Sequence, residues 1–138
     1  MQTLLEILKR AGGWNPSLYL KIENAPYMAL VIEATGESGP SGLPAISVAH
    51  YGEQNGDLMR DPEMCFELGF ADGPHLNAFY YRTDYVGVEQ WSRTIVRGQY
   101  VHIVSLHQQH ERFAKVWDNN LRLQGFAEAF EQQQAPRA

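Results

Sequence analysis

The sequence predicts an α+β fold, in which an antiparallel sheet of about five strands has a short N-terminal helix and a long C-terminal helix packed on one face. Two observations predict it. Hydrophobic residues recur every three to four positions near both ends of the chain, whereas in the middle they alternate with polar residues. The first spacing is typical of helices and the second of strands. Clusters of Gly, Pro, Asn and Asp separate the alternating segments, as expected for strands joined by turns.

The first ten residues predict a short amphipathic helix. Thr3 is placed to cap its start, because a threonine hydroxyl can accept a hydrogen bond from a free helical N–H group. Gly12 and Gly13 are placed to end it, because glycine adopts the left-handed conformation that often follows a helix. Four apolar residues share one face of this helix: Leu4, Leu5, Ile7 and Leu8.

Five segments of the middle region predict strands. They are residues 18–23, 27–34, 45–51, 64–69 and 78–89. Residues 35–44 contain three glycines and two prolines and therefore predict a loop. The fifth strand can break near Thr83 and Asp84. Residues 91–101 are ambiguous, and residues 99–104 fit either another strand or the approach to the last helix.

The end of the chain predicts a long helix that begins near Ser105. Apolar residues recur there at helical spacing as far as Phe130. Gly125 is a candidate break in this helix, because glycine is about 1 kcal/mol less favourable than alanine in a helix interior. We therefore expect a single α+β domain over residues 1–130 and a flexible tail over residues 131–138.

Composition narrows the classes of protein that the chain can belong to. Its 138 residues fit one domain. Eleven Lys and Arg against sixteen Asp and Glu give a net charge of −5, which makes nucleic acid an unlikely partner, since affinity for phosphates comes from basic residues. The single cysteine, Cys65, excludes an intramolecular disulfide and zinc sites built from paired cysteines. No signal peptide, membrane-spanning stretch or cofactor motif is recognisable, so we expect a cytoplasmic protein with no membrane association and no cofactor.

The net charge is concentrated in residues 50–75. This segment holds one basic residue, Arg60, so its own net charge is −5 and the other 112 residues are neutral. Its acidic residues are Glu53, Asp57, Asp61, Glu63, Glu67 and Asp72. Because Asn55 and Gly56 form a strong turn signal, we expect an acidic hairpin. Pairing of Arg60 with Asp57 or Asp61 across the turn is one structural interpretation of these charges.

This hairpin and the neighbouring aromatic residues form the candidate binding site. Loops on a rigid scaffold commonly carry binding residues. The candidate binding residues are His50, Tyr51, Glu53, Asn55, Asp57, Arg60, Asp61, Glu63, Tyr81 and Tyr85. A histidine with carboxylates can also bind a divalent cation or transfer protons, which is the competing interpretation of the same residues. A half-buried histidine and a solvated acidic turn would explain the pattern without any function.

Two weaker candidates lie in the last third of the chain. His107 and His110 are three residues apart and share a helix face near His102 and Glu111, but no His-Glu-x-x-His motif is present and a polar helix flank explains them better. Five basic residues could form a mildly basic face that binds nucleic acid or, through self-association, the acidic hairpin: Arg93, Arg97, Arg112, Lys115 and Arg122.

The central string also carries a family resemblance. It reads His50-Tyr-Gly-Glu-Gln-Asn-Gly-Asp-Leu-Met-Arg-Asp-Pro-Glu-Met64. Together with Leu-Leu-Glu-Ile-Leu before Gly-Gly-Trp14 and the closing Trp117-Asp-x-Asn-Leu121, it resembles a small uncharacterised bacterial domain family. The resemblance implies an accessory protein of plasmids, phages or integrated mobile elements, and it implies no activity.

These observations favour a non-enzymatic binding or adaptor protein of a mobile genetic element. It would act by protein–protein contact or self-association through the acidic hairpin, and antagonism of a host system is one form of this function. The alternative is a metal-assisted hydrolase or acid–base enzyme that uses His50 and nearby carboxylates.

Overall fold

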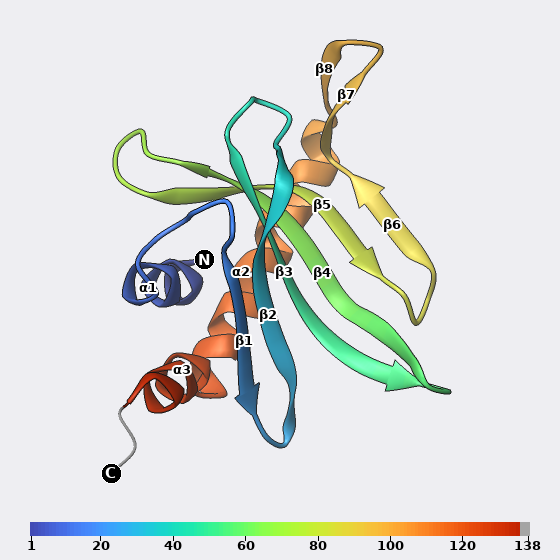
Figure 1. The fold of residues 1–138 in the computed structure, drawn as a ribbon. Helices are drawn as coiled ribbons and strands as arrows, with labels where there is room; N and C mark the ends of the chain where they lie inside the picture. The colour runs from blue at the N-terminus through green and yellow to red at the C-terminus, as the bar shows by residue number, and fades with distance from the viewer. Residues whose placement is uncertain (136–138) are drawn as a thin grey trace.

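The computed structural model describes residues 1–135 and confirms the α+β class. Its main sheet is antiparallel and has six strands in the order β1-β2-β3-β4-β5-β6, so the expected number of about five is one too few. A separate two-stranded sheet, β7–β8, follows it along the chain (Figure 1). The strands are β1 (Tyr19–Asn24), β2 (Tyr27–Ser38), β3 (Pro44–Gln54), β4 (Asp57–Gly69), β5 (His75–Thr83), β6 (Val88–Trp91), β7 (Arg93–Val96) and β8 (Gln99–His102).

The sixth strand arises where the sequence predicted a break. The segment expected as one strand over residues 78–89 turns after Thr83, so that β5 and β6 pair as a hairpin. The ambiguous residues that follow form the β7–β8 hairpin. Strands also extend beyond their predicted limits. β2 continues into the predicted loop as far as Ser38, and β4 begins at Asp57 rather than near Met64.

The first helix, α1, spans Gln2–Arg10, so Thr3 lies inside it and does not cap it. The carboxylate of Asp118 caps it instead, accepting hydrogen bonds from the backbone N–H groups of Thr3 and Leu4, each at 3.2 Å. The predicted end is confirmed. Gly12 and Gly13 have positive φ values, and their N–H groups bond back to the carbonyls of Lys9 and Leu8, as in a Schellman motif.

The C-terminal helix divides at the predicted glycine. α2 spans Val104–Leu123 and α3 spans Phe126–Gln134, and between them Gly125 has a φ of 82°. This left-handed conformation ends one helix and redirects the next. α3 continues to Gln134, into the segment expected to be a tail. The remainder of that expected tail, residues 136–138, lies outside the described residues.

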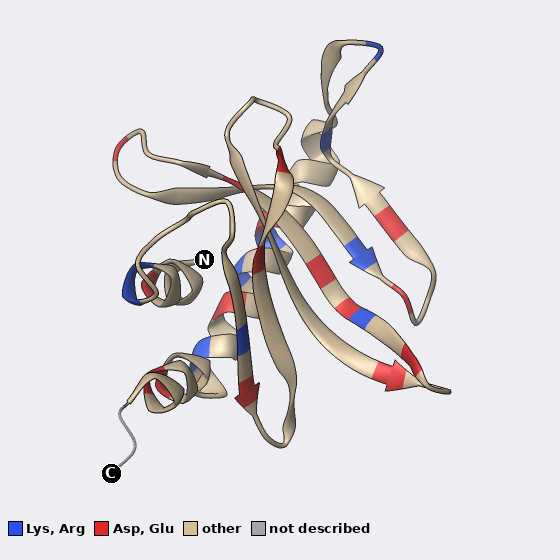
Figure 2. Ribbon diagram, in the orientation of Figure 1, with Lys and Arg blue, Asp and Glu red and all other residues tan. Residues whose placement is uncertain are grey.

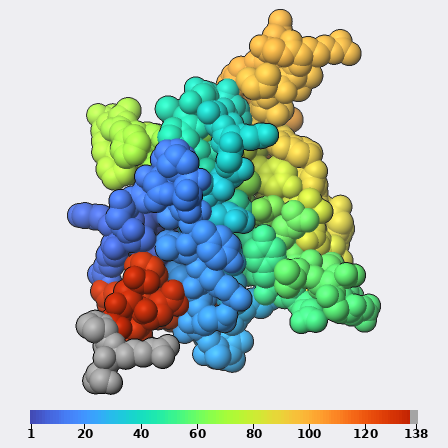
Figure 3. Space-filling model, viewed as in Figure 1, coloured from blue at the N-terminus to red at the C-terminus, as the bar shows by residue number. Residues whose placement is uncertain are grey.

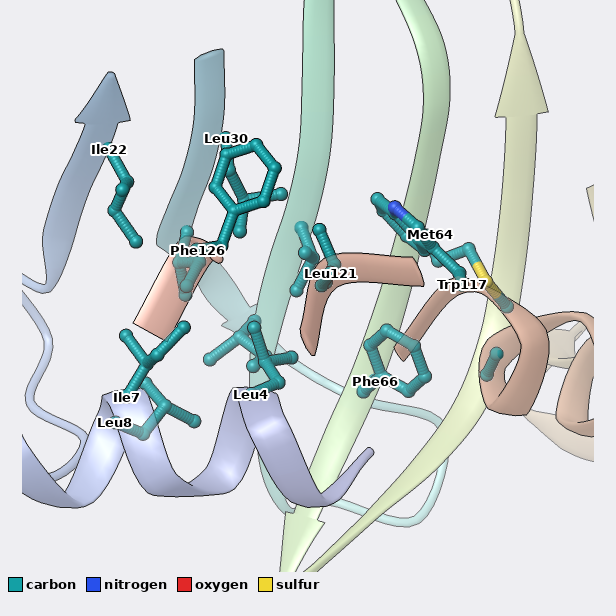
Figure 4. Close-up of a cluster of buried hydrophobic side chains, with 14 of the residues drawn as sticks. Leu4, Ile7, Leu8, Ile22, Leu30, Met64, Phe66, Trp117, Leu121 and Phe126 are labelled. Atoms are coloured by element: carbon teal, nitrogen blue, oxygen red, sulfur yellow. The ribbon is translucent and has the colours of Figure 1, made fainter. Parts of the chain in front are cut away.

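All three helices lie on one side of the main sheet. α2 crosses behind β3, β4 and β5, and α1 and α3 lie beside β1, so the opposite face carries no helix (Figures 1 and 3). The core fills the space between the helices and the covered face, where Leu4, Leu30, Phe66, Leu121 and Phe126 are fully buried (Figure 4). We call the uncovered side the open face.

None of the helices in residues 1–135 combines the length and the apolar character needed to cross a lipid bilayer.

Candidate functional site

The acidic hairpin is the two-stranded end of β3 and β4. Asn55 and Gly56 form its turn, with φ values of 52° and 86°, which is the backbone of a type I′ hairpin turn. Glu53 lies directly opposite Leu58, and Gln54 lies opposite Asp57. Leu58 is 73% exposed. The tip therefore presents a free apolar side chain between carboxylates, and it extends beyond the body of the molecule (Figure 3).

Arg60, the only basic residue of this segment, pairs with neither Asp57 nor Asp61. Its backbone N–H and its Nε donate to Asp84 Oδ2 at 2.8 and 3.1 Å, and its guanidinium lies 3.6 Å from Glu63. Asp84 also accepts from Arg82 Nε at 2.7 Å. These donors, led by the Arg60 backbone N–H, hold the pKa of Asp84 at about 2.

The charge of the hairpin tip is consequently left unbalanced. Arg60 forms ion pairs with Asp84 and Glu63. No basic side chain of residues 1–135 forms an ion pair with Glu53 or Asp57. Figure 2 shows red ribbon at this end of β3 and β4, with blue only further along β4.

His50 does not belong to this exposed surface. It is 8% exposed and faces the helices, with its ring 5.6 Å from that of Trp117 and 5.5 Å from that of Phe126. Its Nδ1 donates to the carbonyl of Met28 at 3.1 Å. Burial lowers the pKa of His50, which favours the neutral ring. The position of His50 in the strand explains its burial. Ile46, Val48 and His50 are at every second position of β3 and therefore share the covered face.

The ten candidate residues therefore divide between two faces. Tyr51 lies directly opposite Arg60 on the neighbouring strand, and both are on the open face together with Glu53 and Glu63. Tyr81 is on the covered side, 5.3 Å from the ring of Phe113. Four candidate residues remain. Asp61 Oδ1 accepts a hydrogen bond from the hydroxyl of Thr83 at 3.4 Å. Asn55 and Asp57 are at the exposed tip, and the hydroxyl of Tyr85 lies against Gly52.

The sequence did not single out a groove on the open face. This groove contains a cavity of about 510 Å³, which is lined by residues that include Glu33, Glu63, Tyr80 and Trp91. Ser47 donates to Glu63 Oε2 at 2.6 Å within it. The alternation of β2 and β3 could have shown that Glu33 and Ser47 share a face, but it could not show that Trp91 closes the groove, because β6 was not predicted.

Cys65 also lies in this groove, and it is 9% exposed. Burial raises the pKa of its thiol to about 12. Since the thiolate is the nucleophilic form, this cysteine is not activated for covalent chemistry.

Glu67, one of the six acidic residues counted in residues 50–75, is buried. Its carboxylate forms an ion pair with Arg93, and both side chains are at most 3% exposed. It also accepts from the backbone N–H groups of Ser41 and Leu43. Glu67 therefore holds the β2–β3 loop to β7 and adds nothing to the binding surface.

The histidines of the last third are joined to one another and to the sheet. His102 Nε2 lies 3.0 Å from His107 Nδ1, and His107 Nε2 lies 2.8 Å from Asn77 and 3.2 Å from Glu111. His110 is buried against Ser92 and Gln90. Across residues 1–135, no three His, Cys, Asp or Glu side chains are grouped so that they could hold a metal ion.

A family model described as a domain of unknown function (DUF6908) matches residues 2–127. No curated protein and no solved structure is significantly similar to the chain.

Proposed function

Since the chain belongs to the DUF6908 family, a domain of unknown function, we propose from its structure that it is a non-enzymatic binding protein whose acidic hairpin contacts a basic segment of a protein partner. The observation that carries the proposal is the tip of the hairpin. Leu58 is 73% exposed there, beside Glu53 and Asp57, which no basic side chain of residues 1–135 neutralises. The mobile-element context and antagonism of a host system stay predictions from the sequence.

The electrostatic support for this proposal comes from the way in which Arg60 is held. An arginine that was free to move could fold over the tip carboxylates and neutralise them. Asp84 instead fixes Arg60 by its backbone and side chain together, at 2.8 and 3.1 Å. The tip therefore keeps its negative field for an approaching cation, which favours fast association with basic partners.

The apolar support comes from Leu58. Charge by itself gives a weak and salt-sensitive contact at an exposed site, since exposed ion pairs contribute about 0–1 kcal/mol. A leucine that is buried on binding adds about 1.5–3 kcal/mol. We therefore expect a partner segment that combines lysine or arginine with an aliphatic or aromatic residue.

The alternative enzyme that uses His50 gains no support from this geometry. The ring of His50 faces Trp117 and Phe126 rather than the carboxylates of the tip. No second function is proposed.

The test is a fluorescence-anisotropy titration with a labelled peptide that contains Lys, Arg and Leu, and a second peptide in which Gln replaces the basic residues. We expect the wild-type protein to bind the basic peptide alone, with affinity falling as salt rises. Reversal of the tip charges in Glu53→Lys/Asp57→Lys should weaken binding by about tenfold or more, which corresponds to 1.4 kcal/mol.

Glu6→Lys/Glu23→Lys is the matched control, because it changes the net charge equally at two exposed side chains on α1 and β1. Leu58→Ser isolates the apolar part, and circular dichroism establishes that each variant is folded. An equal loss of binding in the tip and control variants, or binding that the tip variant retains, would overturn the proposal.

A further inference from the structure

The β7–β8 hairpin projects from the molecule as an arm, which we define as Arg93–His102 (Figures 1 and 3). Its four residue pairs run from Arg93 opposite His102 to Val96 opposite Gln99. Arg97 and Gly98 make the turn, with φ values of 53° and 78°. An isolated two-stranded hairpin is only marginally stable in water, so an arm of this kind ordinarily packs against something.

The surface of the arm is apolar where the body of the protein does not cover it. Ile95 and Val96 are each 50% exposed, and every residue of β8 is exposed. The exposed large apolar residues of the arm and the two residues after it are Ile95, Val96, Tyr100, Val101, Ile103 and Val104. The register puts Ile95 and Tyr100 on one face of the hairpin and Val96 and Val101 on the other, so both faces of the arm present apolar side chains. Exposed apolar surface of this kind can mark an interaction site.

The base of the arm is firmly fixed, although its length is uncovered. Arg93 Nε donates to the hydroxyl of Tyr100 at 2.9 Å, and the guanidinium of Arg93 is also paired with the buried Glu67. Behind the arm, the N–H of Ile103 donates to the carbonyl of Ser92 at 2.8 Å. The arm is therefore anchored at its base, while Val96 and the turn at Arg97 and Gly98 lie further from the anchoring contacts.

A complementary groove lies on the open face at the base of the arm. Two cavities, of about 510 and 260 Å³, share Glu37, Ser38, Phe79 and Trp91. We call this the open-face groove. Its walls include aromatic rings, and the larger cavity adds the carboxylates of Glu33 and Glu63. No basic side chain of residues 1–135 forms an ion pair with Glu33 or Glu37.

The arm and the groove carry opposite charges, and both also present apolar side chains. The arm has Arg97 at its tip and contains no acidic residue, whereas the groove has three carboxylates beside apolar rings. Within one chain, Arg93, Thr94 and Ile95 at the base of the arm line the smaller cavity, whereas the turn of the arm, with Arg97, projects from the molecule (Figure 1). We propose that the arm of a second copy of this chain occupies the open-face groove, and that the exchange is mutual in a two-fold dimer.

Mutual exchange explains why one chain carries both parts. A two-fold interface uses the same patch on each subunit, so the patch has to be complementary to itself. The arm and the groove adjoin one another and provide this complementarity. The proposal goes beyond the acidic hairpin, which lies at the other end of the open face (Figure 1), and neither proposal depends on the other.

The test is sedimentation velocity of the full chain over a range of concentrations. We expect the wild-type protein to form a species of twice the chain mass of 15.7 kDa. Ile95→Asp and Val96→Asp place a charge on the exposed arm and should give monomers. Arg97→Glu should raise the dissociation constant by about tenfold or more, since arginines are common among the residues that dominate interfaces.

A charge exchange identifies the groove as the receptor. Glu37→Arg should weaken the dimer as Arg97→Glu does, and the double variant should recover it, whereas Leu58→Asp on the acidic hairpin should leave it unchanged. Circular dichroism establishes folding. A wild-type protein that stays monomeric would overturn the proposal, as would a dimer that persists in folded Ile95→Asp or a double variant that fails to recover.

Discussion

Glu67 and Arg93 show how one pair of residues joins three parts of the chain. The carboxylate of Glu67 lies under Gly39, where a Cβ atom would collide with the Glu67 side chain. It accepts from the N–H groups of Ser41 and Leu43, and its other oxygen meets the Arg93 guanidinium. A fully buried charge is stable only when it is paired and hydrogen-bonded in this way.

Removal of one partner should therefore be costly. We expect Glu67→Ala to lower the free energy of unfolding by about 3–5 kcal/mol, because it leaves the Arg93 charge buried without a partner. Urea denaturation measures this change. Glu67→Met/Arg93→Met should recover much of it.

The exposed pair of Lys21 and Glu23 provides the control. Glu23→Ala should change the free energy of unfolding by less than about 1 kcal/mol. Equal effects of Glu67→Ala and Glu23→Ala would show that the buried pair is not required.

Sequence reasoning counted Glu67 in the net charge of residues 50–75 and could not tell that this carboxylate is buried. The alternation of β4 does place Glu67 on a different face from Phe66, but it cannot identify a partner 26 residues away. The burial of His50 was closer to prediction, since its position in the alternation of β3 puts it beside Ile46 and Val48.

At the scale of elements, Asp84 links the β5–β6 turn to β4. Its N–H donates to the carbonyl of Arg60 at 2.9 Å, and its carboxylate accepts from the backbone and side chain of Arg60. This contact fixes the edge strand β6, which pairs with β5 alone. It also fixes the arginine that would otherwise reach the acidic tip.

Asp84→Ala should loosen this connection. Because charge-assisted hydrogen bonds contribute about 1.5–3 kcal/mol each, we expect the free energy of unfolding to fall by about 2–3 kcal/mol. Thermal or urea unfolding measures the loss. The pKa of Asp84 lies below its ordinary value, so its contribution is present above about pH 4 and is lost as the pH falls toward 2.

The control for this variant is Asp57→Ala at the exposed start of β4. It removes the same charge without a comparable hydrogen-bond network. A loss in Asp84→Ala no larger than in Asp57→Ala would contradict the assigned role.

The positions of the helices were largely predictable, because their apolar spacing and terminal glycines are local signals. Strand lengths were less so. Four of the seven residues 57–63 are charged and none is buried, since this end of the hairpin lies beyond the core, so no alternation of buried apolar residues marks the start of β4.

Across the whole molecule, three histidines are held in environments that favour the neutral ring. Burial lowers the pKa of His50, His107 and His110. The unfolded chain binds protons on these rings from about pH 6.5 downward, whereas the folded chain resists protonation. The histidine contribution to stability is thus complete above pH 6.5 and is lost as the pH falls.

We therefore expect the free energy of unfolding to decrease between pH 7 and pH 5, above the range in which Asp84 titrates. His50→Phe/His110→Phe should show a shallower decrease, measured by urea denaturation at each pH. His75→Phe, which removes an exposed histidine, is the control. If His75→Phe reduced the pH dependence of the free energy of unfolding as much as the double variant does, the assignment of that dependence to His50 and His110 would be contradicted.

The sequence by itself determined the α+β class, the terminal helices, the turn at Asn55 and Gly56, and the concentration of charge in residues 50–75. Each of these depends on residues close together in the chain, so periodicity, turn preference and counting suffice. The tertiary structure decided which of those charges are free. Arg60 is fixed by Asp84 and Glu67 by Arg93, and these partners are 24 and 26 residues away. The apolar arm likewise becomes visible only when the fold leaves it uncovered, because exposure depends on packing between distant elements.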